Sequence, residues 1–246
     1  MSNIISELGK HIYFTQYATG SLILTLFTIT VALFFLTGRQ KTLSTVNLGI
    51  CCICLSMFHF AFFLSLIIIH PGAAYHRWLV IAAGLSAPIF TTRTIIFFPD
   101  NRNRRIARIV SVILSLIVLF FIVLYINETV NAVKYFSVDG HFWDLKAESA
   151  NRLFGMVILI EQFMMLGFGV WKSFYLEKKE LVWFALVIII MFIGTTTPAV
   201  LNILNRNGII TREFFLLGLN LSHIFAFFLI AIFYLNTTKD RFSFLG

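Results

Sequence analysis

The sequence predicts an all-α membrane protein: a seven-transmembrane-helix bundle with a small extracytoplasmic hairpin between helices four and five. Hydrophobic residues make up 59% of the 246 residues and charged residues only 12%, against about 45–50% and about 25% in soluble domains. The mean hydropathy is +0.90. Seven apolar runs are each long enough for a hydrocarbon layer about 30 Å thick, which takes roughly 20 helical residues. An ordinary soluble protein and a disordered chain are both excluded.

The apolar runs follow one another along the whole chain. They cover about Tyr17–Thr37, Asn47–Ile69, Trp78–Phe98, Ile109–Ile126, Ala150–Phe174, Leu181–Ile203 and Phe214–Asn236. Lipid favours helices here, because each backbone N–H must find its acceptor within its own segment. No Pro/Gly-rich linker or low-complexity tract divides the chain, so residues 1–246 are predicted to form one domain.

The basic residues predict the orientation. With the N-terminus outside, eleven Lys and Arg fall in the inner segments and seven in the outer ones, and Arg93 lies within a span. The densest short loop holds Arg102, Arg104, Arg105 and Arg108. Positive charge collects on the cytoplasmic side of membrane proteins, so we expect the N-terminus outside and the C-terminus in the cytoplasm. The net charge of +8 is therefore read as a topology signal, and nucleic acid is not an expected partner.

The long outer connection, residues 127–149, predicts the hairpin. Asp139-Gly140 stands between two aromatic, strand-prone stretches, and Asp-Gly suits the positive φ angles of a type I′ turn. The alternative is an irregular loop whose Trp and Tyr anchor at the membrane interface. Asp139, His141 and Trp143 are the outer-loop candidates for contact with a ligand.

Two charged residues lie well inside the spans. Glu161 is near the middle of span five, and Arg93 is in the inner half of span three, roughly 10 Å away along the membrane normal at about 1.5 Å per helical residue. Intramembrane charges usually face a bundle interior or a wet cavity. One interpretation is a structural Glu–Arg pair or an Arg that reaches the headgroups; the other is a proton- or ligand-linked switch.

Three further polar residues lie near the middle of the membrane. His59 is in span two, and Asn220 and His223 are three residues apart in span seven, hence on one helical face. They either line a pocket shared with Glu161 or bond neighbouring helices as structural contacts. A metal site is not expected, because it takes three or four convergent ligands and no tight His or Cys spacing occurs.

Two prolines within spans are kink candidates. Pro88 lies in span three, and Pro198 follows three threonines in span six. Proline removes one helical hydrogen bond, and neighbouring Ser or Thr hydroxyls can satisfy the freed carbonyl. Such kinks are plausible hinges and are also common in helices that do not move.

Catalytic motifs are absent from the sequence. There is no H-E-x-x-H, G-x-S-x-G, Walker loop or kinase H-R-D set. Span seven has no Lys, so a retinal Schiff base cannot form there. We therefore expect neither an enzyme nor a bound cofactor.

The pattern resembles the histidine-kinase N-terminal seven-transmembrane sensor region of bacterial receptors, in its spirochaete-type form. The local matches are Ala87-Pro88-Ile89-Phe90 to Phe97-Phe98-Pro99 before a basic inner loop, the Tyr135–Trp143 outer stretch, and the exit segment 234–244. The resemblance covers nearly the whole chain and implies sensing or signalling. Members of that family carry output domains such as kinases or cyclases, whereas this sequence stops at Gly246. No catalytic residue carries over, because catalysis in the family lies in the output domain.

The leading expectation is a multi-pass sensor or receptor of the bacterial inner (cytoplasmic) membrane. A small ligand or membrane stimulus would bias two packings of the bundle, and the last helix would pass the change to a cytoplasmic output domain or partner. The lipid bilayer is the expected partner, and self-association into a homo-oligomer is left open. The alternatives are a small transporter or channel, with Glu161, Arg93, His59 and His223 along the path, and an accessory subunit of a membrane complex.

Overall fold

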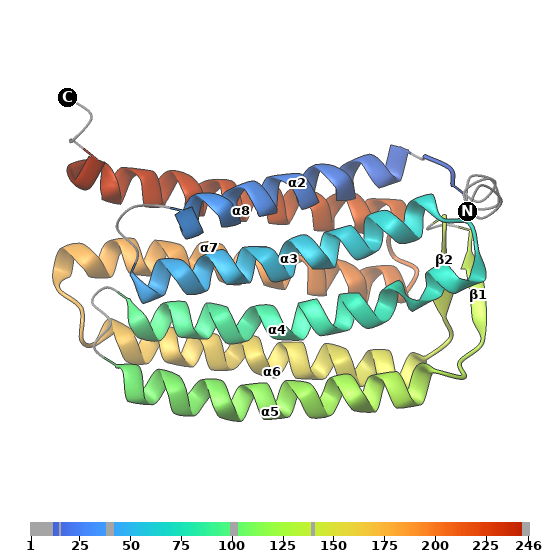
Figure 1. Ribbon diagram of the computed structural model, residues 1–246, viewed down its shortest axis with the longest axis horizontal. Helices are drawn as coiled ribbons and strands as arrows, with labels where there is room; N and C mark the ends of the chain where they lie inside the picture. The colour runs from blue at the N-terminus through green and yellow to red at the C-terminus, as the bar shows by residue number, and fades with distance from the viewer. Residues whose placement is uncertain (1–11, 15, 38–41, 99–102, 139–140, 243–246) are drawn as a thin grey trace.

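The computed structural model describes residues 12–14, 16–37, 42–98, 103–138 and 141–242 and confirms the all-α bundle (Figure 1). Within these residues, seven helices are long and apolar enough to cross a membrane. They are α2 (Gln16–Thr37), α3 (Leu43–Ile67), α4 (His76–Phe97), α5 (Arg104–Thr129), α6 (Glu148–Ser173), α7 (Lys178–Arg206) and α8 (Arg212–Phe242). The chain is thus built as a multi-pass integral membrane protein.

The predicted hairpin forms from β1 (Lys134–Ser137) and β2 (Phe142–Leu145), which pair antiparallel with Ser137 opposite Phe142. The His141 N–H donates to the Val138 carbonyl at 3.3 Å, which closes the turn. The central turn residues 139–140 lie outside the described residues. Figure 1 shows the hairpin across one end of the bundle, which we call the hairpin end. α2 begins there and α8 ends at the opposite end, as an odd number of crossings requires.

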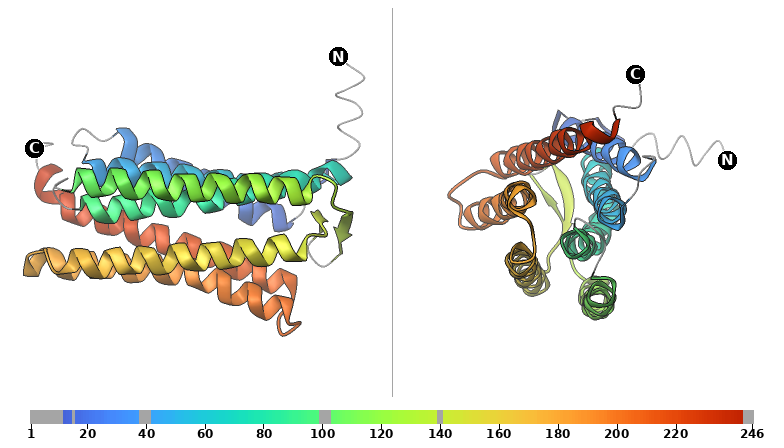
Figure 2. Two further views of the ribbon diagram at one scale, coloured as in Figure 1. Left: turned by 90° about the horizontal axis from the view of Figure 1, so that it is seen from below. Right: turned by 90° about the vertical axis from the view of Figure 1, so that its left-hand side faces the viewer.

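Six helices, α4, α3, α2, α8, α7 and α6, form a closed ring, and α5 packs on α4 from outside it, as Figure 2 shows end-on. Neighbours in space run α5, α4, α3, α2, α8, α7, α6, and α6 returns to pack against α4. In its most apolar stretch, 61% of α4 is buried but only 22% of α5, because α4 is covered by α3, α5 and α6 while most of α5 faces outward. α5 and α6 are joined through the hairpin, yet each packs mainly against α4.

Local sequence signals fix where helices begin. Thr42 caps α3: its hydroxyl accepts from the Thr45 N–H, and the Thr45 hydroxyl accepts from the Thr42 N–H at 2.9 Å. This reciprocal capping satisfies two N–H groups that the first helical turn leaves without partners. Pro71 opens the short 3-10 helix η1 (Pro71–Tyr75) before α4, where its missing N–H is of no consequence. Pro88 and Pro198 lie inside α4 and α7, which continue as α-helices past them, and their role as hinges stays a prediction.

Candidate functional site

The hairpin is fastened to the bundle by a buried ion pair. Alternate residues of a strand share a face, and β2 turns Phe142 and Asp144 inward, where they are 1% and 5% exposed. Arg77, in the first turn of α4, donates from Nε to Asp144 Oδ1 at 2.6 Å and from its terminal nitrogen to Oδ2. Paired parallel bonds of this kind fix orientation as well as adding energy. We call the Arg77–Asp144 pair the latch.

Phe142 brings three helices together beneath the hairpin. Its ring lies edge-on to Phe62 of α3 at 6.4 Å and to His76 of α4 at 5.5 Å, measured between ring centroids. The Arg212 guanidinium, in the first turn of α8, lies 5.5 Å from the Phe142 ring centroid and 4.5 Å from that of Phe215. Cations over aromatic faces attract, most strongly where water is excluded. The hairpin is therefore in contact with the start of α8.

The latch makes docking of the hairpin acid-sensitive. Burial raises the pKa of Asp144, but its charge interaction and hydrogen bonds with the Arg77 guanidinium, helped by the Leu145 N–H, outweigh burial and hold the pKa below its ordinary value of 3.8. Because the folded-state pKa is the lower one, the latch is at full strength above the ordinary value and is lost as the pH falls through the folded-state pKa. We expect Trp143 fluorescence to stay constant from neutral pH to about pH 4 and to change only below it. Asp144→Asn should lack this transition, and undocking near neutral pH would contradict the prediction.

The outer-loop candidates chosen from sequence lie elsewhere. Asp139 lies outside the described residues, and His141 occupies the turn with a φ of 55°. Trp143 packs against Phe136 at 5.8 Å between centroids, on the face of β2 opposite Asp144. Sequence reasoning missed the latch, although a signal existed: Phe142 and Asp144 share one face of a strand, so burying the Phe142 ring on the bundle also buries an acidic residue that needs a partner.

The two midplane histidines meet. His59 Nε2 and His223 Nδ1 are 2.9 Å apart, so one ring donates to the other and α3 is bonded to α8. His59 Nδ1 is buried without a partner among the described residues. If His59 carries its proton on Nε2, that N–H donates to His223 Nδ1, and His59 Nδ1 is an acceptor without a donor. A buried acceptor without a partner is tolerated better than a buried N–H without one. Asn220 lies instead against α2, where a Cβ on Gly20 would come within 2.5 Å of Asn220 Nδ2.

Glu161 and Arg93 come to nearly the same height but do not pair. The Phe154 ring of α6 reaches Gly84 of α4, and these two helices run in the same direction, so counting along each helix places Arg93 and Glu161 at similar depths. Both oxygens of Glu161 and the Nε of Arg93 are buried without a hydrogen-bond partner in the described part of the chain. The Arg93 guanidinium instead lies 5.8 Å from the Phe97 ring centroid, one turn along its own helix.

A third unpaired polar group lies at this height. α7 runs opposite to α6, and a Cβ on Gly169 would meet Ile188 at 3.3 Å. Because the helices are antiparallel, eight residues back from Gly169 and eight residues forward from Ile188 bring Glu161 and Thr196 to the same level. The Thr196 hydroxyl is also buried without a partner in the described chain. We call Arg93, Glu161 and Thr196 the unpaired layer. His59 and His223 bond each other and have no hydrogen bond to the unpaired layer among the described residues, so a pocket that they share with Glu161 stays a prediction.

The described residues contain no group of three or more His, Cys, Asp or Glu that could hold a metal ion. No protein-family model matches the sequence, and no curated protein matches it. What the chain does is therefore inferred from its own geometry: a latched outer hairpin in contact with α8, a histidine pair between α3 and α8, and an unpaired layer among α4, α6 and α7.

Proposed function

We propose that the protein is a membrane sensor module of the bacterial cytoplasmic membrane, in which α8 carries a change at the hairpin end to a cytoplasmic output domain or partner. The observation that carries this proposal is the contact between the hairpin and the first turn of α8, Phe142 against Arg212. α8 is 31 residues long and runs to the opposite end of the bundle (Figure 1). Movement of the hairpin would thus act directly on a helix that spans the membrane.

The histidine pair supports the same route. It bonds α8 to α3, and α3 contacts the hairpin through Phe62 and Phe142. A stimulus shifts the bundle only if it binds its two packings with different affinity; a tenfold difference corresponds to about 1.4 kcal/mol. The hairpin and α8 share contacts that such a difference could redistribute.

The test is to release the hairpin and follow α8. Spin labels on Phe228→Cys of α8 and Arg105→Cys near the start of α5 report the distance between these helices in lipid nanodiscs; both positions are exposed and the native cysteines are buried. We expect Phe142→Ala to shift or broaden that distance distribution. Trp143→Ala, on the opposite face of the same strand, is the matched control and should not. An unchanged distribution in Phe142→Ala would overturn the proposal.

A second function, proton- or ion-coupled transport, is favoured by the unpaired layer. A buried carboxyl, a guanidinium nitrogen and a hydroxyl without partners at one height are what a translocation path across the midplane would contain. Proteoliposome flux separates the two proposals. Flux that Glu161→Gln abolishes, with no response of α8 to hairpin release, would favour transport over sensing.

A further inference from the structure

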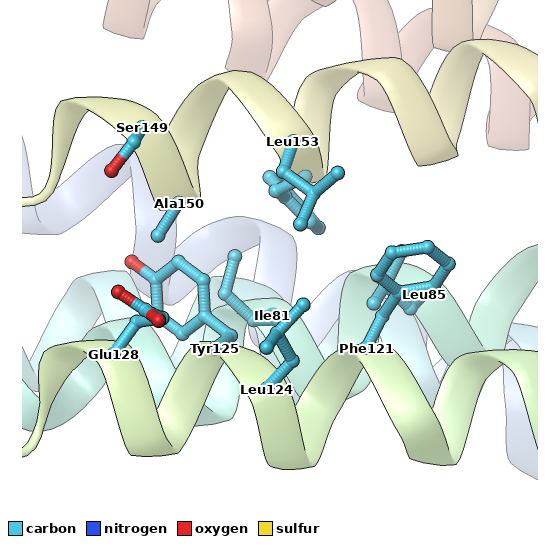
Figure 3. Close-up of a pocket in the computed structure, with 10 residues that line it drawn as sticks. Ile81, Leu85, Phe121, Leu124, Tyr125, Glu128, Ser149, Ala150 and Leu153 are labelled. Atoms are coloured by element: carbon cyan, nitrogen blue, oxygen red, sulfur yellow. The ribbon is translucent and has the colours of Figure 1, made fainter.

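A cavity of about 240 Å³ lies between α4, α5 and α6 near the hairpin end (Figure 3). Its walls are mainly apolar and include Ile81 and Leu85 of α4, Phe121 of α5 and Leu153 of α6. Figure 3 shows Glu128 and Ser149 together at one end of the cavity, with Leu85 and Phe121 at the other. The cavity therefore has an apolar length and one polar end.

The polar end lies where α5 ends, at the hairpin end of the bundle. Glu128 is in the last turn of α5, which ends at Thr129, and seven helical residues place it about 10 Å from Phe121 along the axis. Its side chain is exposed and forms no hydrogen bond or ion pair with the rest of the described chain. Below it, the Tyr125 hydroxyl donates to Asn151 Oδ1 of α6 at 3.0 Å. An unpaired carboxylate thus stands above an apolar slot.

The slot is reachable from the bilayer. α5 is the least buried of the seven helices, and it packs along α4 while making few contacts with α6. The Phe121 and Leu153 side chains are only partly buried. An apolar chain in the leaflet at the hairpin end can enter between α5 and α6 without crossing water.

We propose that this cavity binds a single-chain cationic amphiphile, with its alkyl chain between α5 and α6 and its ammonium group at Glu128. Charge selects the head, because Glu128 offers an acceptor with no partner of its own. The lining selects the tail, because the rest of the cavity wall is mainly apolar. The proposal that the cavity binds this ligand rests on the cavity alone. The proposal that the ligand is the stimulus of the sensor also rests on the proposed function.

Occupancy would act where the hairpin is attached. β1 follows α5 and β2 precedes α6, so a chain that separates α5 from α6 moves the two ends of the hairpin apart. The hairpin bears on α8 through Phe142 and Arg212. Binding in the slot is thereby connected to the helix that reaches the other side of the membrane.

The experiment is photolabelling of the full chain in nanodiscs with dodecylamine that carries a diazirine at its chain end. We expect saturable labelling near Leu85 and Phe121, competed by unlabelled dodecylamine. Leu153→Trp fills the slot and should lower labelling about tenfold or more. Leu119→Trp, the same substitution at a 58% exposed position on α5, is the matched control. Glu128→Gln should weaken dodecylamine competition about fivefold, the effect of one exposed ion pair, and leave competition by dodecanol unchanged.

Unsaturable labelling spread over lipid-facing residues such as Leu119 would mean an adventitious additive only and would overturn the proposal. So would slot labelling that Leu153→Trp leaves intact. Unchanged competition in Glu128→Gln, an exposed position with no folding role, would overturn the cationic head. Saturable labelling that persists while Phe142→Ala fails to move α8 would overturn the proposed function but not this site.

Discussion

Arg77→Leu is expected to lower the free energy of unfolding by about 3 kcal/mol and to release the hairpin. The substitution leaves the Asp144 carboxylate buried and without its partner, and removing one member of a buried pair typically costs about 3–5 kcal/mol. The lower value applies because the Arg77 side chain is 16% exposed and that of Asp144 7% exposed. Hydrogen exchange of the β2 amides and thermal unfolding in detergent measure the local and global effects.

The double variant Arg77→Leu, Asp144→Leu distinguishes the ion pair from simple packing. Replacing both charges by apolar side chains removes the uncompensated carboxylate, so most of the lost stability should return. Arg152→Leu, an exposed arginine of α6, is the control and should change stability by less than about 0.5 kcal/mol. If the double variant is as unstable as Arg77→Leu alone, the pair is not what holds the hairpin.

The latch shows which features could not be predicted from the sequence. Hydropathy predicted all seven helices, with ends that differ by six residues at most, because span length and lipid exposure are properties of one segment at a time. The Asp-Gly signal predicted the hairpin for the same reason. Which face of β2 turns inward is decided by a partner far away in sequence: Asp144 meets Arg77, which the charge pattern had assigned only to outer topology.

The midplane residues show the same limit in the membrane. The position of each residue within its span correctly predicted that His59 and His223 lie at a similar height, and their rings are hydrogen-bonded. The same reasoning from position within the span suggested an ion pair between Glu161 and Arg93, which the structure does not contain. Pairing depends on how each helix is rotated and on the order of helices around the bundle, and an all-apolar helix surface carries little information about either.

Glu161→Leu is expected to stabilise the protein by about 1–3 kcal/mol, the opposite of what most core substitutions do. The Glu161 side chain is 4% exposed, and neither oxygen has a hydrogen-bond partner in the described chain. An unsatisfied buried polar group costs about 1–3 kcal/mol, which an apolar side chain of similar size does not incur. In a chain of this length the midpoint of thermal unfolding should rise by about 2–4 °C per kcal/mol.

The neighbouring residue provides the control. Gln162 is 6% exposed but has an interaction partner, so Gln162→Leu removes a satisfied contact and should lower stability by about 1 kcal/mol. Opposite signs for these adjacent substitutions would show that the effect comes from the missing partner and not from adding apolar surface. A loss of stability in Glu161→Leu would mean that the carboxyl is bonded in the membrane.

The same variant tells which function the unpaired layer serves. A side chain that destabilises its own bundle is expected where activity requires it. If Glu161→Leu gains stability and abolishes proteoliposome flux, the carboxyl belongs to a transport path. If it gains stability while α8 still responds to release of the hairpin, signalling runs along the hairpin and α8 without the unpaired layer. If the α8 response is lost, Glu161 lies on the route between the two ends, and α6 and α7 must move together with α8.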